Sequence, residues 1–249
     1  MATICVTGGG TSAPIDDVRR ITNVSTGRFA AALAESSLAA GDRVIHLRTP
    51  QAAAPFEQAL RFDPAAPDLE RESARVLEVG RRFRALSSRY EPRVLPNGTV
   101  GEYAHELESI LRGEAVDVVF LAAAVSDYEP EPASGKLSSD AEELVIRCRR
   151  TQKVIRSVAD WAPSAYRVGF KLLSDVSVER LVEVARASAI ANRVDLVAAN
   201  DFRTVREGRH TIHLVAPDEP GHETLEPGGD LATRLLERVR VRASARRSP

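Results

Sequence analysis

The chain opens with Ile4-Cys5-Val6-Thr7-Gly8-Gly9-Gly10-Thr11, an apolar run followed at once by three glycines. The apolar run is typical of a buried strand, and residues 29–40 are typical of a helix that packs through small and apolar side chains. The glycine-rich segment is therefore the connection from a first strand to a first helix. In an open α/β sheet this connection lies over the carboxyl ends of the strands, where ligands bind. Because glycines let a backbone approach phosphate and helix N-termini attract anions, this stretch predicts an anion-binding site.

Apolar runs and helical periodicities alternate along the rest of the chain. A capping-box pattern at Thr99 and Glu102 opens one of the helices. Residues 211–215 alternate as in an edge strand or hairpin arm. Such alternation predicts an α/β, Rossmann-like fold with a mainly parallel sheet, helices on both faces and an edge hairpin. Strands are predicted at 43–47, 116–124, 143–148, 167–172 and 195–199, and helices at 99–112, 151–159, from 177 onward, and 231–241.

We expect residues 1–249 to form a single nucleotide-binding domain, because neither a repeat nor a linker divides the chain. Residues 48–98 break the pattern: several prolines interrupt them, and only 71–86 has helical character. We interpret this region as an irregular insertion, which could be a lid, a dimerisation element or a plain surface excursion. Residues 242–249 are expected to form a flexible tail.

Composition limits the partners. The net charge is −1, which gives no field that would gather nucleic acid or an acidic membrane. Cys5 and Cys148 both lie in apolar, strand-like runs, which favours reduced, buried thiols in a cytoplasmic protein. No stretch approaches the roughly 20 apolar residues of a membrane span. The first strand begins almost at Met1, so we expect no signal peptide.

Motifs for common nucleotide-binding sites are incomplete. The dinucleotide spacing G-x-G-x-x-G fails because Ala13 stands at its third glycine, and the second strand ends without the acidic residue that would bind a ribose. Gly135-Lys136 is followed by Leu137, not by the hydroxyl residue of a phosphate-binding P-loop. A mononucleotide or a phosphorylated substrate therefore fits better than NAD.

Four separated segments together resemble phosphopantothenate–cysteine ligase, also called phosphopantothenoylcysteine synthetase, of coenzyme A biosynthesis. They occur in the order of that family between about residues 4 and 215, and they are similar to its monofunctional, eukaryotic-like branch. The segments are Gly8-Gly9-Gly10-Thr11 through Val24-Ser25-Thr26-Gly27-Arg28; Leu121 to Tyr128, followed by Lys136; Asp160-Trp161-Ala162-Pro163 leading to Gly169-Phe170-Lys171-Leu172; and Val197-Ala198-Ala199-Asn200.

The resemblance implies a ligase that joins 4′-phosphopantothenate to L-cysteine. In such a reaction the carboxylate attacks a nucleotide α-phosphate, pyrophosphate leaves, and the cysteine amine attacks the acyl-nucleotidylate. The first step brings anions together, so the site needs cations and oriented N–H donors. The family further implies Mg²⁺, ATP or else CTP as cosubstrate, and a homodimer in which one subunit contributes to the substrate site of the other.

The resemblance also implies roles for individual residues, each at the matching position of this chain. Asn23 would donate its amide to the substrate carboxylate without adding charge, and Asp127 could bind substrate or base, ligate Mg²⁺ or cap a turn. Arg19 and Arg20 are both candidates for the substrate phosphate or the pyrophosphate, and the metal ligands stay unassigned. The implied catalytic residues are Asn23, Lys136 and Arg19; the nucleotide-binding residues are Gly9, Gly10, Ser25, Thr26, Gly27, Ala30, Phe170, Lys171 and Asn200; the substrate-binding residues are Asn23, Arg20, Ala123, Ala124 and Asp127.

The chain departs from the family pattern at several positions. Of the Lys-x-Lys-Lys loop of the bacterial fusion enzymes only Lys136 is kept, and Ser188 and Asn192 stand where those enzymes have further lysines. Ala30 stands where the family often has glycine. These departures leave open a nucleotide-binding paralogue without ligase activity. The rival enzyme class is an NAD(P)-dependent oxidoreductase.

Overall fold

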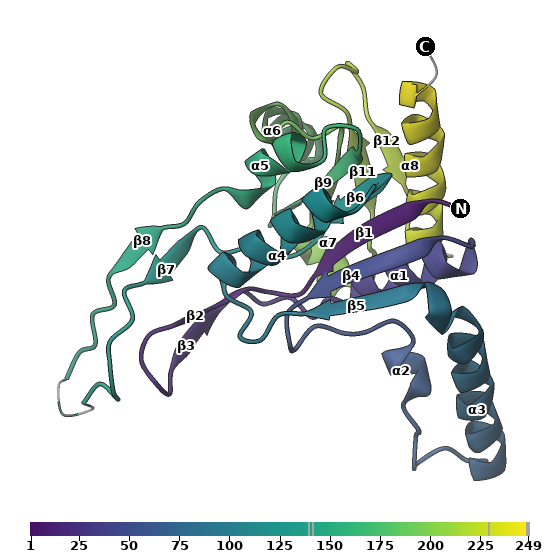
Figure 1. Ribbon diagram of the computed structural model, residues 1–249, viewed down its shortest axis with the longest axis horizontal. Helices are drawn as coiled ribbons and strands as arrows, with labels where there is room; N and C mark the ends of the chain where they lie inside the picture. The colour runs from purple at the N-terminus through teal and green to yellow at the C-terminus, as the bar shows by residue number, and fades with distance from the viewer. Residues whose placement is uncertain (139, 141, 229, 248–249) are drawn as a thin grey trace.

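The computed structural model describes all residues except 139, 141, 229, 248 and 249, and within the described residues eight strands form a central sheet (Figure 1). The strands are β1 (Thr3–Gly8), β4 (Arg43–Arg48), β5 (Tyr90–Val94), β6 (Val118–Leu121), β9 (Tyr166–Leu173), β10 (Leu196–Asp201), β11 (Ile212–Val215) and β12 (Glu223–Leu225). They lie in the order β12-β11-β10-β9-β6-β1-β4-β5.

The sheet is parallel from β5 to β10, and β11 and β12 add an antiparallel hairpin at one edge. From β1 the chain moves outward to β4 and β5, and then returns to the other side of β1 with β6. This reversal between β1 and β6 is the position at which open α/β sheets bind ligands, beyond the carboxyl ends of the strands. The predicted Rossmann-like sheet with an edge hairpin is confirmed.

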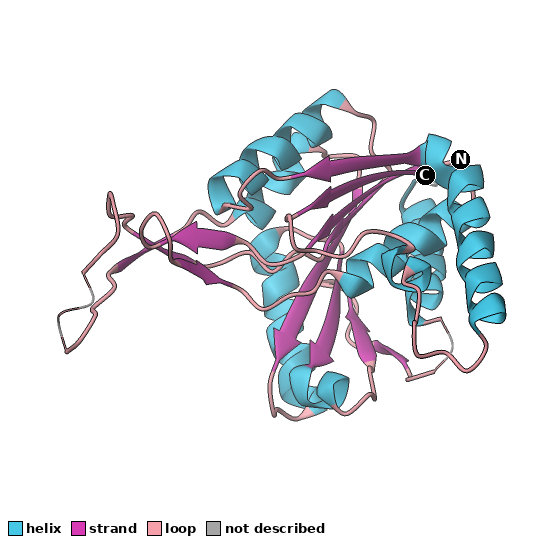
Figure 2. Cartoon of the chain, turned by 90° about the horizontal axis from the view of Figure 1, so that it is seen from below, coloured by secondary structure: helices cyan, strands magenta, loops and turns pink. Residues whose placement is uncertain are grey.

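Helices cover both faces of the sheet (Figure 2). In β1, Cys5 faces one hydrophobic cluster while Ile4 and Val6 face the other, as the two-residue period of a strand requires. Burial raises the pKa of the Cys5 thiol to about 12, so this cysteine is chemically inert. Helices α4 (Val100–Gly113), α5 (Val154–Trp161) and α6 (Val178–Asn192) cover one face, and α1 (Arg28–Ala39), α3 (Leu69–Leu86) and α8 (Leu231–Arg247) cover the other. The short helices are α2 (Glu57–Leu60), α7 (Phe202–Arg206) and the 3₁₀ turn η1 (Ser87–Arg89).

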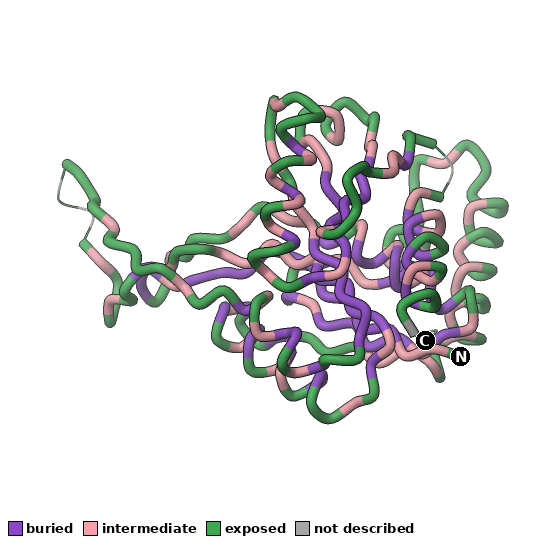
Figure 3. The backbone as a smooth tube through the Cα atoms, turned by 90° about the horizontal axis from the view of Figure 1, so that it is seen from above, coloured by how far each residue is buried: buried purple, intermediate pink, exposed green. Residues whose placement is uncertain are grey.

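Short antiparallel strands form an arm that projects from the sheet (Figure 1). The arm comprises residues 12–22, with β2 (Ser12–Pro14) and β3 (Arg20–Thr22), and residues 128–150, with β7 (Tyr128–Pro130) and β8 (Cys148–Arg150). The tube view shows that most of the arm is exposed, whereas the sheet is buried (Figure 3).

Asp16 is a buried carboxylate in the arm and joins its two parts. Its Oδ2 accepts a hydrogen bond from the N–H of Leu137 at 3.0 Å, and its Oδ1 accepts one from the N–H of Arg19 at 2.7 Å. Burial alone would raise the pKa of this carboxyl, but the backbone donors and the Arg19 guanidinium outweigh burial and lower the pKa to about 2. The Asp16 carboxylate is therefore ionised and holds the loop that carries Lys136 against residues 16–19.

Residues 48–98 differ from the predicted irregular insertion. The predicted helix is present as α3, but 90–94 form β5, a parallel edge strand beside β4. This strand could not be recognised in the sequence, because it contains Pro92 and the charged Glu91 and Arg93. An edge strand does not require alternating apolar side chains.

Two other predictions were wrong: the strand 143–148 with a buried Cys148, and the tail that begins at residue 242. Cys148 is exposed, not buried, and residues 143–147 are not a strand; only 148–150 pair, with β7. Helix α8 continues to Arg247 instead of ending at 241, so of the predicted tail only residues 248 and 249 lie outside the described residues. Ala243 is buried in α8, and Arg246 forms an ion pair with Asp195 at 2.8 Å, which explains why the helix does not fray earlier.

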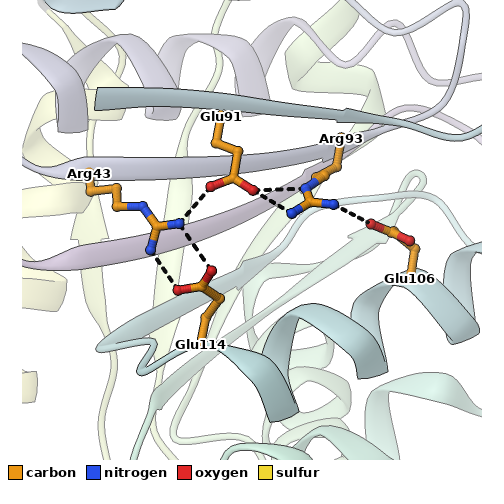
Figure 4. A network of polar contacts seen from close by, with 5 residues as sticks. All are labelled: Arg43, Glu91, Arg93, Glu106 and Glu114. Atoms are coloured by element: carbon orange, nitrogen blue, oxygen red, sulfur yellow. Dashed lines mark hydrogen bonds and ion pairs between the residues drawn. The ribbon is translucent and has the colours of Figure 1, made fainter. Parts of the chain in front are cut away.

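A charged network fixes β5 to the sheet (Figure 4). Arg43 of β4 contacts Glu91 of β5 at 2.6 Å and Glu114, at the end of α4, at 2.7 Å. Arg93 contacts the same Glu91 at 2.6 Å and reaches Glu106 of α4 at 3.4 Å. The hydrogen bond from Arg43 lowers the pKa of Glu114, so this carboxylate is stabilised in the folded state.

We predict that Arg43→Ala lowers the free energy of unfolding by an amount that depends on pH. Because the folded-state pKa of Glu114 lies below its ordinary value of 4.5, the network stabilises the fold above that pH and loses its effect as the pH falls further. Urea denaturation should show a loss of about 1 kcal/mol at neutral pH and a smaller loss near pH 3. Arg81→Ala, which removes an exposed ion pair on α3, serves as the control. An equal loss at both pH values would contradict this account.

Candidate functional site

A cavity of about 490 Å³ lies at the carboxyl ends of the central strands. Its walls are residues 23–30 after β1, residues 121–125 after β6, residues 169–172 of β9 and Asn200 of β10, with residues 152–155 at the start of α5 closing one side. This volume and position are those of a small-molecule site in an open α/β sheet.

Most of the residues predicted for the site line this cavity. They come from four separate stretches of the chain, and the fold brings them to one space. These residues are Asn23, Ser25, Thr26, Gly27, Ala30, Ala123, Ala124, Asp127, Phe170, Lys171 and Asn200. Ser188 and Asn192 line it as well, and the Asn192 amide donates to the Ser188 hydroxyl at 3.0 Å.

Gly9 and Gly10 do not line the cavity but allow its wall to form. A Cβ on Gly10 would lie 2.0 Å from the carbonyl oxygen of Asn23. Gly9 has φ +90°, and a Cβ there would lie 2.1 Å from Oγ1 of Thr49. Only glycine therefore lets the two loops close over the end of β1.

Asn23 is fixed against the opposite wall. Its backbone N–H donates to the Thr11 carbonyl at 3.1 Å, and its side-chain Nδ2 donates to the Ala124 carbonyl at 3.1 Å. Ala124 in turn donates its N–H to Gly9 at 2.8 Å, and Thr7 Oγ1 accepts the N–H of Ala123 at 3.2 Å. The half-buried Asn23 amide is thus oriented by the sheet while its residue lines the cavity.

The first turn of α1 faces the cavity without a side-chain cap. Gly27 is the N-cap residue and has no side chain to cap the helix, and Thr26 Oγ1 accepts only a long hydrogen bond, at 3.5 Å, from the N–H of Arg28. The N-terminal N–H groups of a helix have no partner within the helix and carry partial positive charge. Ser25, Thr26 and Gly27 thus place hydroxyl and amide donors where an anion could bind.

An aromatic cluster forms another wall. The Phe29 ring meets Phe170 edge-on at 6.0 Å and His210 at 5.2 Å between centroids. Burial lowers the pKa of His210, which favours its neutral, aromatic form. This wall, completed by Ile212, suits a flat heterocycle. No pattern in the sequence pairs Phe29 with His210, because the contact joins distant segments.

Lysine is concentrated at the cavity. Of the 34 basic Lys and Arg residues, only Lys136, Lys153 and Lys171 are lysines. Lys153 and Lys171 line the cavity; Lys153 forms an ion pair with Asp127, whereas Lys171 has no ion pair among the described residues. Lys153 was not predicted as a site residue, although the scarcity of lysine in the sequence could have pointed to it.

Arg19, Arg20 and Lys136 lie on the arm and do not line the cavity of their own chain. Arg19 contacts Asp16 at 2.9 Å and donates to the Leu137 carbonyl at 2.5 Å. Arg20 donates to Ser12 Oγ at 2.7 Å, and Lys136 is exposed.

A parallel sheet in this strand order, with a cavity at its reversal, defines the class of Rossmann-like ligand-binding proteins. Within that class, the chain belongs to the family of the DNA/pantothenate metabolism flavoprotein C-terminal domain, whose model matches residues 1–66 and 99–241. The unmatched residues 67–98 contain α3, η1 and β5.

Curated relatives carry ligase names. Phosphopantothenate–cysteine ligase 1 of Arabidopsis thaliana is 32% identical over 82% of this chain and 70% of its own length. The Homo sapiens phosphopantothenate–cysteine ligase is 28% identical over 97% of this chain and 86% of its own length. The coenzyme A biosynthesis bifunctional protein CoaBC of Thermococcus kodakarensis is 28% identical, and this chain spans 50% of its length.

Solved structures have the same fold. The DNA/pantothenate metabolism flavoprotein from Streptococcus pneumoniae superposes with a TM-score of 0.74 at 27% identity, over 97% of this chain and all of that one. A Cab2 mutant in complex with phosphopantothenate-cysteine superposes with a TM-score of 0.83 over 98% of this chain and 87% of that one, and at 22% identity it speaks to the fold alone.

In the described part of the chain, no helix combines the length and hydropathy needed to cross a membrane. The described residues also contain no group of three or more His, Cys, Asp or Glu side chains arranged to hold a metal ion.

We predict that Gly10→Ala destabilises the fold by displacing the Asn23 loop. The added methyl would meet the Asn23 carbonyl at 2.0 Å, and overpacking of this kind costs about 1–3 kcal/mol. Gly101→Ala on α4 is the control, since a Cβ there meets nothing within 4 Å. Urea denaturation should show a loss for the first variant and none for the second. Equal stabilities would refute the packing role of Gly10.

Proposed function

We propose that this chain joins 4′-phosphopantothenate to L-cysteine, with ATP preferred to CTP as cosubstrate, through an acyl-nucleotidylate. One observation carries the proposal: in a member of this family, Asn23, the start of α1 and residues 123–127 converge on a single cavity. A carboxylate is a poor electrophile, and nucleotidylation gives it a leaving group. The main task of the site is then to hold two anions together.

The lining residues divide this task. Ser25, Thr26 and Gly27 at the start of α1 donate to the phosphates, and Lys171, which forms no ion pair with the described residues, supplies positive charge to the same cavity. The wall of Phe170 and Asn200 receives the base. Asn23 holds the reacting carboxyl group through its amide, which adds no charge, so both the acid and the acyl intermediate are accepted.

Mg²⁺ fits this arrangement as a partner of the nucleotide. Among the described residues that line the cavity, Asp127 is the only carboxylate. Mg²⁺ in such sites keeps several waters and binds largely through substrate phosphates. When bound, it would neutralise phosphate charge; no dedicated set of protein ligands is required.

A homodimer would bring the arm to a cavity. Val18, Ile21, Tyr128 and Val145 are exposed apolar side chains on the arm, between 37% and 78% accessible. Clustered apolar exposure of this kind marks interaction surfaces. Because Arg19, Arg20 and Lys136 lie on the arm, their proposed roles toward phosphate and carboxylate are exercised in the cavity of the second subunit.

The direct test is release of pyrophosphate. We expect release with ATP to require phosphopantothenate, and amide formation to require cysteine as well. If the chain binds ATP but no nucleotide supports either step, it is a nucleotide-binding paralogue; stabilisation by nicotinamide dinucleotides alone would favour an oxidoreductase.

We predict that Asn23→Asp retains nucleotide binding but loses amide formation by two orders of magnitude or more, about 3 kcal/mol or more of transition-state stabilisation. The carboxylate cannot donate to the Ala124 carbonyl and repels the substrate acid. Calorimetric titration with ATP and a cysteine-dependent product assay separate the two effects. Normal turnover would remove Asn23 from the mechanism.

We predict that Lys136→Ala impairs nucleotidylation, and that mixing it with Asn23→Asp restores activity. If the arm serves the partner's cavity, random exchange of subunits yields about one intact site in four. Activity is measured after the mixed subunits are dissociated and reassociated. No recovery, with mixed dimers shown by mass spectrometry, would mean that Lys136 acts in its own chain or not at all.

A further inference from the structure

Helix α3 packs against the rest of the molecule through only one of its sides. The centroid of the Phe83 ring lies 5.8 Å from that of Phe56 and 6.2 Å from that of Tyr90, and Val79 packs against the same face of the sheet. Yet no residue of Leu69–Leu86, a fully described range, is buried. The opposite side of α3, called the outward side below, therefore faces away from the sheet.

The outward side of α3 carries large apolar side chains. Leu69 is 51% exposed and Leu77 is 61% exposed. The small Ser73 stands between them at helical spacing, so the two leucines form one stripe. Helix α3 lies outside the part of the chain that the family model matches, and no residue of 48–98, all of them described, lines the cavity. Ligand binding in the cavity therefore does not account for this stripe.

Opposite charges stand at the two ends of the same side. Glu70, Leu77 and Arg84 follow one another at heptad spacing, which returns to the same side of a helix after every two turns. The carboxylate thus lies about two turns before Leu77, and the guanidinium lies about two turns after it. Both charged side chains are exposed, and neither forms an ion pair with the described residues.

We propose that the outward side of α3 is an interface for a second copy of this chain, bound in antiparallel orientation about a twofold axis at Leu77. In that arrangement Leu77 packs against its own copy, and Glu70 of each copy meets Arg84 of the other. One set of residues then supplies an apolar centre and two flanking ion pairs. Antiparallel alignment also brings the positive end of each helix dipole to the negative end of the other.

Other occupants fit the outward side less well. A helix that binds a membrane surface combines a strong apolar face with a polar face rich in cations. Here only two leucines are exposed, and Glu70 stands beside them. A parallel second copy would set carboxylate against carboxylate and guanidinium against guanidinium, which is unfavourable. The order of the charges therefore selects an antiparallel copy.

The arm and α3 lie at opposite ends of the molecule (Figure 1). A contact through α3 therefore leaves the arm available for the homodimer of the proposed function. Two different twofold contacts in one chain build an assembly larger than a dimer. The α3 interface does not depend on the ligase reaction, because no step proposed for that reaction uses α3.

The test is an exchange of charges, measured by sedimentation equilibrium of the full chain. Wild-type protein should associate beyond the dimer made by the arm as its concentration rises over a roughly hundredfold range. Glu70→Arg sets arginine against arginine at both ends of the contact, and Arg84→Glu sets carboxylate against carboxylate. Each variant alone should weaken this association about tenfold or more.

An equal mixture of the two variants should associate as wild type does, because every contact between unlike chains then joins opposite charges. A merely weakened helix cannot produce this recovery, since each chain in the mixture still carries its substitution. The matched controls are Arg71→Glu and Glu78→Arg, which reverse charges about 100° around the helix from Glu70 and Leu77. Both controls should associate as wild type does, and all four variants should keep wild-type ligase activity.

Several results would overturn the α3 interface. Variants that fail to associate when mixed would do so, as would association that neither substitution alters. Wild-type protein that binds vesicles of anionic phospholipid but does not associate through α3 would assign the outward side to a membrane instead. A chain without ligase activity that still shows recovery on mixing would overturn the proposed function and leave this interface in place.

Discussion

The close approach of three stretches of chain at the end of β1 is the constraint on which the site depends. Ala124 exchanges hydrogen bonds with Gly9 and Thr11 at 2.8 and 3.0 Å, and Asn23 donates to Thr11 at 3.1 Å. A side chain on Gly10 would prevent this approach. Because β1 lies between β4 and β6 at the reversal of the sheet, fixing its last residues also fixes the loops that surround the cavity.

The fold could be predicted where burial dictates the pattern of side chains. The central strands are apolar runs buried on both faces, and the helices that cover them show a helical period. The order of the motifs along the chain agrees with the family to which the chain belongs. Strand β5 was not predicted, because an edge strand needs backbone partners more than apolar side chains. Its Glu91 instead forms ion pairs with Arg43 and Arg93. The arm was not predicted, because its short strands bury few side chains. Cys148, which lies in an apolar run of the sequence, is exposed in the fold.

The sequence predicted which residues line the candidate site better than it predicted what each residue does there. Motif resemblance identified segments that do meet in one cavity, such as 25–27 and 123–127. It could not show that Gly10 supports the wall from behind, or that Arg19 contacts Asp16 on the arm. Spacing along a chain says which residues are neighbours, but the direction of a side chain depends on packing between distant segments. His210, held against Phe29, could only be found in three dimensions.

The uneven use of basic residues has a practical consequence. Arginine covers the molecule, and apart from the chain terminus its nucleophilic amines belong to Lys136, Lys153 and Lys171. A reagent that acylates primary amines therefore labels the side chains of this protein at the cavity and the arm, besides the terminal amine, and leaves the guanidinium groups unmodified. The same scarcity gives any covalent inhibitor aimed at a cavity amine very few competing positions within the protein.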